Sequence, residues 1–104
     1  MIENNGYNSQ LQERQKYARP HYSLGKALAQ QGEWEEAIAC YRKAIERDPD
    51  YPETYQSLGD ALLKQGKLEE AANAYAQKNK IEKYYLKNLR VNPNVKPKFK
   101  IVKE

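Results

Sequence analysis

The sequence repeats itself at a fixed spacing of 34 residues, without gaps, so that Leu24 in the first copy aligns with Leu58 in the second. The residues that coincide are mostly small or apolar, and they follow the same order in both copies. They are Leu24 and Leu58, Gly25 and Gly59, Ala27 and Ala61, Leu28 and Leu62, Gly32 and Gly66, Ala37 and Ala71, and Tyr41 and Tyr75. A fixed period of this length indicates a repeated supersecondary unit that buries its hydrophobic face against its neighbours. The sequence therefore predicts a repeat architecture.

The first part of each unit has the pattern of an amphipathic helix. Leu24, Ala27 and Leu28 recur at helical spacing, and so do the matching residues of the second unit. Gly25 and Gly59 lie inside these helices, where glycine costs about 1 kcal/mol relative to alanine. This cost predicts that a neighbouring helix lies too close to each glycine for a side chain to fit.

The second part of each unit predicts another helix. Gly32 and Gly66 suit the left-handed conformation that ends a first helix. Beyond each glycine, three positions at helical spacing predict the buried stripe of the second helix. These positions are Trp34 or Leu68, Ala37 or Ala71, and Tyr41 or Tyr75.

At these residues the unit resembles the tetratricopeptide repeat, whose pattern is W-x2-L-G-x2-Y, then A-x3-F, then P. The matching segments are HYSLGKAL (21–28) and YQSLGDAL (55–62) for the first helices, and AIACY (37–41) and AANAY (71–75) for the second. The resemblance covers residues 18 to about 78, and it implies an all-α solenoid of two helix-turn-helix units. His21 departs from the family pattern, because a large aromatic residue is usual there.

The second unit also departs from the first at its end. Lys78 and Lys83 stand where the first unit has Ala44 and Pro49. Without that proline nothing stops the second helix, so the sequence predicts one helix from about Leu68 to about Arg90.

This helix carries an apolar face that a solvated helix would not leave open, made of Ile81, Tyr85, Leu86 and Leu89. The helix either bends at residues 78–80 and folds back as a cap, or stays straight and buries this face against a second copy. No glycine or proline lies between Gly66 and Pro93, and sharp kinks usually need one. The straight helix and a homodimer are therefore favoured.

The remaining segments complete the predicted organisation. Residues 1–17 form a partly disordered flanking segment with a short helix near 9–17, and residues 18–51 form the first repeat. Residues 52–90 form the second repeat with its extended helix, and residues 91–104 a basic tail that is extended or disordered. Pro20 and Pro52 suit the first turn of the first helices, where a missing N–H costs nothing.

Charge and cysteine content limit the class of protein. Residues 78–104 carry nine Lys/Arg against two glutamates, whereas residues 1–77 carry nine Lys/Arg against twelve Asp/Glu. Cys40 is the only cysteine, which excludes an intrachain disulfide and fits a reducing compartment. The polar N-terminus lacks the apolar region of a signal peptide. We expect a cytoplasmic protein.

The residues give no support for catalysis. His21 is the only histidine, so sites built on two histidines are excluded. The pairs Glu35-Glu36 and Glu69-Glu70 fall in the first turns of helices, where acidic residues favour the helix dipole. We therefore predict no enzyme activity, no cofactor and no metal site.

Binding is the better hypothesis, since the first helices of stacked helix pairs line an extended concave surface. The sequence predicts that a protein or peptide partner contacts Arg19, Tyr22, Lys26 and Gln30 of the first unit, and Glu53, Gln56, Asp60 and Lys64 of the second. The alternative is that the basic C-terminal segment binds RNA or an anionic membrane surface. A third hypothesis is that the repeats are a regulatory part of a larger enzyme.

Overall fold

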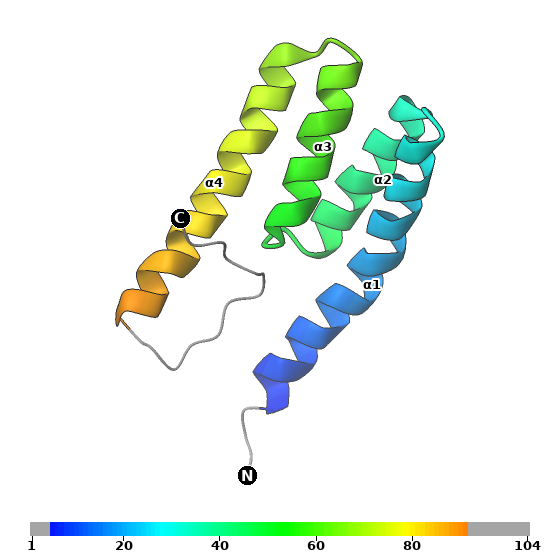
Figure 1. Ribbon diagram of the computed structural model, residues 1–104. Coiled ribbons are helices and arrows are strands. Elements are labelled where there is room, and N and C mark those ends of the chain that lie inside the picture. Colours follow the sequence, from blue (N-terminus) through cyan, green and yellow to red (C-terminus); the bar gives the residue numbers. More distant parts are fainter. Residues whose placement is uncertain (1–4, 92–104) are drawn as a thin grey trace.

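The computed structural model describes residues 5–91 of the chain (Figure 1). This part consists of helices and short turns. The helices are α1 (Asn5–Gln30), α2 (Trp34–Arg47), α3 (Pro52–Lys64) and α4 (Leu68–Val91). Each packs on the next along the chain, with α2 between α1 and α3, and α3 between α2 and α4. The all-α repeat fold predicted from the sequence is confirmed.

Glycines end the first helix of each unit, as predicted. Gly32 has a φ of 80° and Gly66 a φ of 78°, both in the left-handed region that glycine adopts readily. The N–H of Glu33 donates to the carbonyl of Leu28, and the N–H of Lys67 to that of Leu62, each over 2.9 Å. These bonds close the last turn of the helix and reverse the chain toward α2 and α4.

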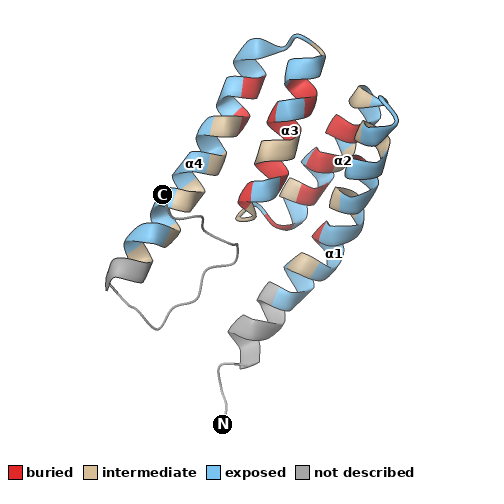
Figure 2. Ribbon diagram, viewed as in Figure 1, coloured by how far each residue is buried: buried red, intermediate tan, exposed pale blue. Residues whose placement is uncertain are grey.

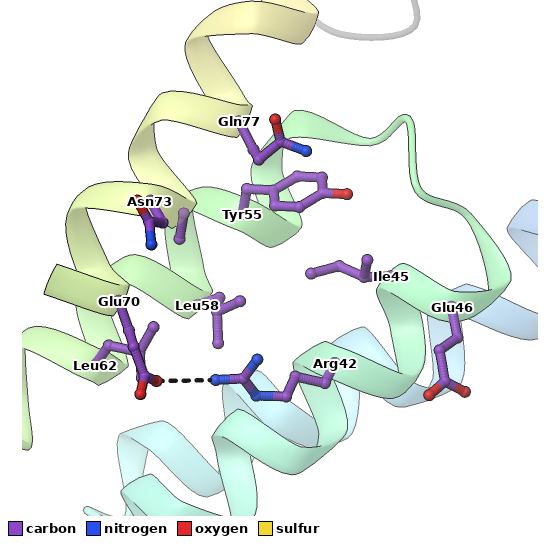
Figure 3. Close-up of a pocket in the computed structure, with 10 residues that line it drawn as sticks. Arg42, Ile45, Glu46, Tyr55, Leu58, Leu62, Glu70, Asn73 and Gln77 are labelled. Atoms are coloured by element: carbon purple, nitrogen blue, oxygen red, sulfur yellow. Dashed lines mark hydrogen bonds and ion pairs between the residues drawn. The ribbon is translucent and has the colours of Figure 1, made fainter. Parts of the chain in front are cut away.

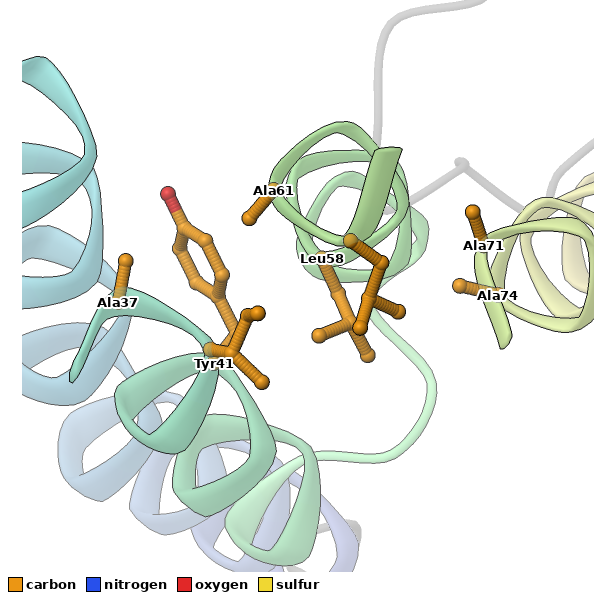
Figure 4. Close-up of a cluster of buried hydrophobic side chains, with 8 residues drawn as sticks. Ala37, Tyr41, Leu58, Ala61, Ala71 and Ala74 are labelled. Carbon is orange, nitrogen blue, oxygen red and sulfur yellow. The ribbon is translucent and has the colours of Figure 1, made fainter. Parts of the chain in front are cut away.

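The hydrophobic core lies between the four helices and combines four alanines with four large side chains, Ile38, Tyr41, Leu58 and Leu62 (Figure 4). Ala37, Ala61 and Ala71 are at most 1% exposed, and Tyr41 and Leu62 are 2% and 1% exposed. Such small residues bring the helix axes close together. The buried residues concentrate on α2, α3 and the first half of α4 (Figure 2).

The predicted start of the first repeat helix is wrong. Residues 5–30 form one helix, with Pro20 inside it, so there is neither a separate short helix at 9–17 nor a helix start at Pro20. Pro52, by contrast, does stand in the first turn of α3, as predicted. The structure does not describe residues 1–4, on which the predicted disorder falls.

The extended second helix is confirmed, because α4 runs without interruption for 24 residues. The alternative in which it bends at 78–80 and folds back is therefore wrong. The buried stripe predicted for this helix is wrong at one residue. Leu68 is 66% exposed, whereas its counterpart Trp34 packs against the core. The predicted tail, residues 92–104, lies outside the described part of the chain.

Candidate functional site

The residues predicted to contact a partner lie on α1 and α3, the first helices of the two units. Arg19, Tyr22, Lys26 and Gln30 are on α1, and Glu53, Gln56, Asp60 and Lys64 on α3. Tyr22 and Gln56 are half-buried and the others are exposed. We call this surface the α1–α3 face.

Tyr22 is the centre of an aromatic cluster on the α1–α3 face. Its ring centre lies 6.0 Å from that of the buried Tyr41 and 5.9 Å from that of Tyr51, which it meets edge to face. Its hydroxyl lies 3.5 Å from the Ser57 hydroxyl, so the side chain reaches from α1 to α3. Edge-to-face rings at these separations attract each other and hold Tyr22 in place.

A groove of about 330 Å³ opens beside this cluster. We call it the tyrosine groove. It is lined by Gln15, Ala18, Arg19, Tyr22, Ser23, Asp48, Tyr51 and Thr54. Tyrosine rings flanked by hydroxyl and guanidinium groups can hold a chain segment that is partly apolar and partly polar. Arg19 and Tyr22 were predicted from the sequence, whereas Tyr51 and Thr54 were not.

Both acidic side chains of the predicted set already accept hydrogen bonds within the chain. The Tyr51 hydroxyl donates to Glu53 over 2.7 Å. Asp60 accepts from the Tyr75 hydroxyl and, over 3.3 Å, from the Gln56 side chain. Burial, and then the neighbouring carboxylate, raises the pKa of Tyr51 and of Tyr75 to about 12.

The cations of the α1–α3 face differ from its carboxylates in the partners that they have. Within residues 12–88, Arg19, Lys26 and Lys64 form no ion pair with a carboxylate. Lys26 Nζ lies 5.5 Å from the centre of the Tyr22 ring, and Lys64 Nζ 5.9 Å from that of Trp34. Such contacts are weak at exposed sites. The positive charges therefore have no carboxylate partner, while Glu53 and Asp60 keep their negative charge but already accept hydrogen bonds.

A second concavity, which the sequence did not predict, lies between α2 and α4 (Figure 3). This hollow of about 640 Å³ has an apolar floor that includes Tyr55, Leu58 and Leu62. An ion pair of 3.2 Å between Arg42 and Glu70 joins its two walls. Both charged side chains are about half exposed, so this pair adds little stability.

The apolar face predicted on the C-terminal helix is divided in the structure. Ile81 and Tyr85 are half-buried and lie one turn apart, whereas Leu86 is 44% exposed. Five residues of helix place Leu86 roughly 140° around the axis from Ile81. The side chains of Leu89 and Arg90, and all of residues 92–104, lie outside the described part, so most of the predicted basic segment does too.

Comparison with known families identifies the repeat. A family model described as "TPR repeat" matches residues 25–66, and one described as "Tetratricopeptide repeat" matches residues 52–82. Together they span more than half of the chain. The chain belongs to the tetratricopeptide repeat family. No curated protein matches it.

In this tetratricopeptide repeat chain, α1 and α2 form one helix pair and α3 and α4 the next. Repeats of this family generally mediate protein–protein interaction. Among the described residues no cluster of His, Cys, Asp or Glu could hold a metal ion. No helix in the same part of the chain is long and apolar enough to cross a membrane.

Proposed function

We propose that this chain is a protein-interaction module that binds an extended peptide segment along the α1–α3 face. The observation that carries the proposal is the tyrosine groove, in which Tyr22 and Tyr51 stand beside Arg19. Tyrosine and arginine are enriched where proteins bind one another, because they combine a large contact area with polar groups. The groove also lies on the first helices, the surface that helix-pair solenoids use for binding.

The charges of this face favour an acidic segment. Glu53 and Asp60 keep their negative charge but already accept hydrogen bonds from Tyr51 and Tyr75, and the Asp48 carboxylate of the groove is buried. Arg19, Lys26 and Lys64 form no such pairs with carboxylates in the described part of the chain. Complementary charge raises the rate of association and selects against basic partners.

Selection of peptides from a displayed random library on the intact chain tests the proposal. Enriched peptides should carry Asp or Glu beside apolar residues. Lys26→Glu should then weaken the binding of such a peptide about tenfold, or about 1.4 kcal/mol, by reversing a charge beside the groove. The measurement is the dissociation constant from fluorescence anisotropy.

Lys43→Glu is the matched control, because Lys43 is an exposed lysine on α2 and not on the α1–α3 face. It makes the same change in net charge and should leave the affinity nearly unchanged. Equal loss in both variants would indicate attraction by net charge alone. Unchanged affinity in Lys26→Glu and in Arg19→Glu would show that the peptide binds elsewhere.

A further inference from the structure

One side of α1 is uncovered at positions that are buried in the second unit. Leu24 is 53% exposed, whereas Leu58, its counterpart in the second unit, is 5% exposed. Ala27 is exposed, whereas Ala61 is 1% exposed. α1 and α3 have the same sequence pattern at these positions, so the difference in exposure comes from the elements that pack on each helix.

In the second unit the covering element is α2, the second helix of the preceding unit. Ile38 and Tyr41 of α2 share a core cluster with Leu58 and Leu62 of α3, and Ile45 packs against that cluster. Within residues 5–91 no helix takes the place of α2 on the corresponding side of α1. We call this side of α1 the Leu24 side.

The Leu24 side carries no charged residue for about four turns. Helical geometry places on it residues that recur at intervals of three and four. They are Tyr17, Pro20, His21, Leu24, Ala27, Leu28 and Gln31. Tyr17, like Leu24, is about half exposed, although the cations of Lys16 and Arg47 lie 5.9 and 5.8 Å from the centre of its ring. Leu28 packs against the core, so the open apolar surface of this side centres on Leu24 with Pro20 and Ala27, and an apolar surface of this kind on a solvent-facing helix favours an interaction.

The opposite end of the stack has an uncovered side on α4. Ala72, Ala76 and Asn79 are exposed there, and in the repeat they correspond to Ile38, Arg42 and Ile45 of α2. We call this the Ala72–Asn79 side. Its small side chains allow another helix to approach closely. At the same end of the molecule Leu68 is 66% exposed, so apolar surface is open at both ends of the stack.

The charges on α1 and α3 are opposite at equivalent positions. Lys16, Arg19 and Lys26 of α1 correspond at the repeat spacing to Asp50, in the turn before α3, and to Glu53 and Asp60 of α3. Within the molecule the basic helix lies beside the acidic one, and an ion pair of 3.2 Å joins Arg14 of α1 to Asp50 in the turn that precedes α3. A copy placed upstream in the same geometry would set its acidic α3 beside the basic α1.

We propose that copies of this chain associate head to tail, with the Ala72–Asn79 side of α4 in one copy packed on the Leu24 side of α1 in the next. The contact continues the existing α2–α3 interface by one repeat. Leu24 takes the role of Leu58, and Ala72 and Ala76 leave room for it. The first helices alternate between basic and acidic along the stack, and this alternation favours the head-to-tail orientation of the two copies.

This arrangement differs from a two-fold dimer in a way that can be measured. The two surfaces in contact are different, so each added copy leaves one of each surface open and the assembly has no fixed size. The α1–α3 faces of successive copies would then form one continuous surface. A long peptide with several binding segments would gain affinity from their proximity to one another.

Sedimentation equilibrium of the full chain over a wide dilution series tests the proposal. The average mass should rise with concentration past twice the chain mass of 12.1 kDa, without a plateau. Leu24→Asp and Ala72→Arg should each be monomeric, because each places a charge at a position that the contact buries, Ala72 being the counterpart of the buried Ile38. Both residues are exposed, so circular dichroism should show unchanged helix content, and Leu24→Gln provides a milder second variant.

Mixing the two blocked variants gives the decisive result. Leu24→Asp keeps an intact Ala72–Asn79 side and Ala72→Arg an intact Leu24 side, so an equimolar mixture should form complexes of two chains and no more. Leu86→Asp is the control, since Leu86 lies on the extension of α4 and its substitution should leave the assembly intact. A monomer at every concentration would overturn the proposal. So would a plateau at two chains that Leu86→Asp abolishes, which would indicate pairing of α4 helices.

Discussion

Gly25 and Gly59 are each in contact with a tyrosine ring from the second helix of the same unit. A Cβ atom at Gly25 would lie 2.7 Å from Tyr41, and one at Gly59 would lie 2.6 Å from Tyr75. Both distances are too short for a contact between atoms that are not bonded, so the close approach predicted from the sequence is confirmed. The two sites differ in one respect, because Tyr41 is buried whereas Tyr75 is half-buried and can move.

Gly25→Ala should therefore lower the free energy of unfolding by about 1–3 kcal/mol, through overpacking against a ring that has no room to move. Gly59→Ala should cost less, because the Tyr75 ring can shift toward solvent and alanine favours the helix by about 1 kcal/mol. Urea unfolding measures both changes, with Ser23→Ala on the exposed surface of α1 as the control. Equal losses at the two glycines would contradict the argument from burial.

The hydrogen bond from Tyr75 to Asp60 gives stability a dependence on alkaline pH. The pKa of Tyr75 is raised from 10.0 to about 12 in the folded chain, so its contribution is complete below pH 10 and is lost as the pH rises through 12. Tyr75→Phe should lower the free energy of unfolding by about 0.5–1.5 kcal/mol at neutral pH. The difference from the parent should shrink between pH 10 and 12. Tyr84→Phe, at an exposed tyrosine of α4, should show neither effect.

At the scale of the helices, the sequence predicted those boundaries that local chemistry sets. Gly32 and Gly66 end α1 and α3 because glycine readily adopts a positive φ. The boundary predicted at Pro20 failed because a proline inside a helix removes one hydrogen bond but does not always end the helix. The carbonyl that loses its partner is that of Lys16, and both Lys16 and Pro20 are exposed, so water can bond to it.

The burial of each helix depended on neighbours that the repeat pattern alone does not show. Leu68 and Trp34 occupy equivalent positions, yet only Trp34 is covered, because no unit follows α4 in the described chain. Only some residues of the tyrosine groove were predicted from the sequence, for a similar reason. Arg19 and Tyr22 follow from the family's first-helix pattern. Tyr51 lies beside them only because the start of α3 is close to α1 in space, which the sequence pattern does not show.

At the scale of the whole molecule, the inner helices have neighbours on two sides and the outer helices on one. Stability in stacked repeats comes from such neighbouring contacts, and local opening is easiest where they are few. Amide hydrogen exchange should therefore be slowest in α2 and α3 and fastest in residues 81–91 of α4. Mass spectrometry of deuterium uptake by the dilute chain measures this order.

Repeating the exchange at high concentration locates the contact between copies. Head-to-tail association covers the Leu24 side of α1 and the Ala72–Asn79 side of α4, so protection should increase in residues 17–31 and 72–79 together. Residues 81–91 should keep their fast exchange, because they extend past the repeated interface. An increase confined to 81–91 would instead mean that α4 helices pair with each other. Such pairing would also cover the part of Ile81 and Tyr85 that stays exposed in the single chain.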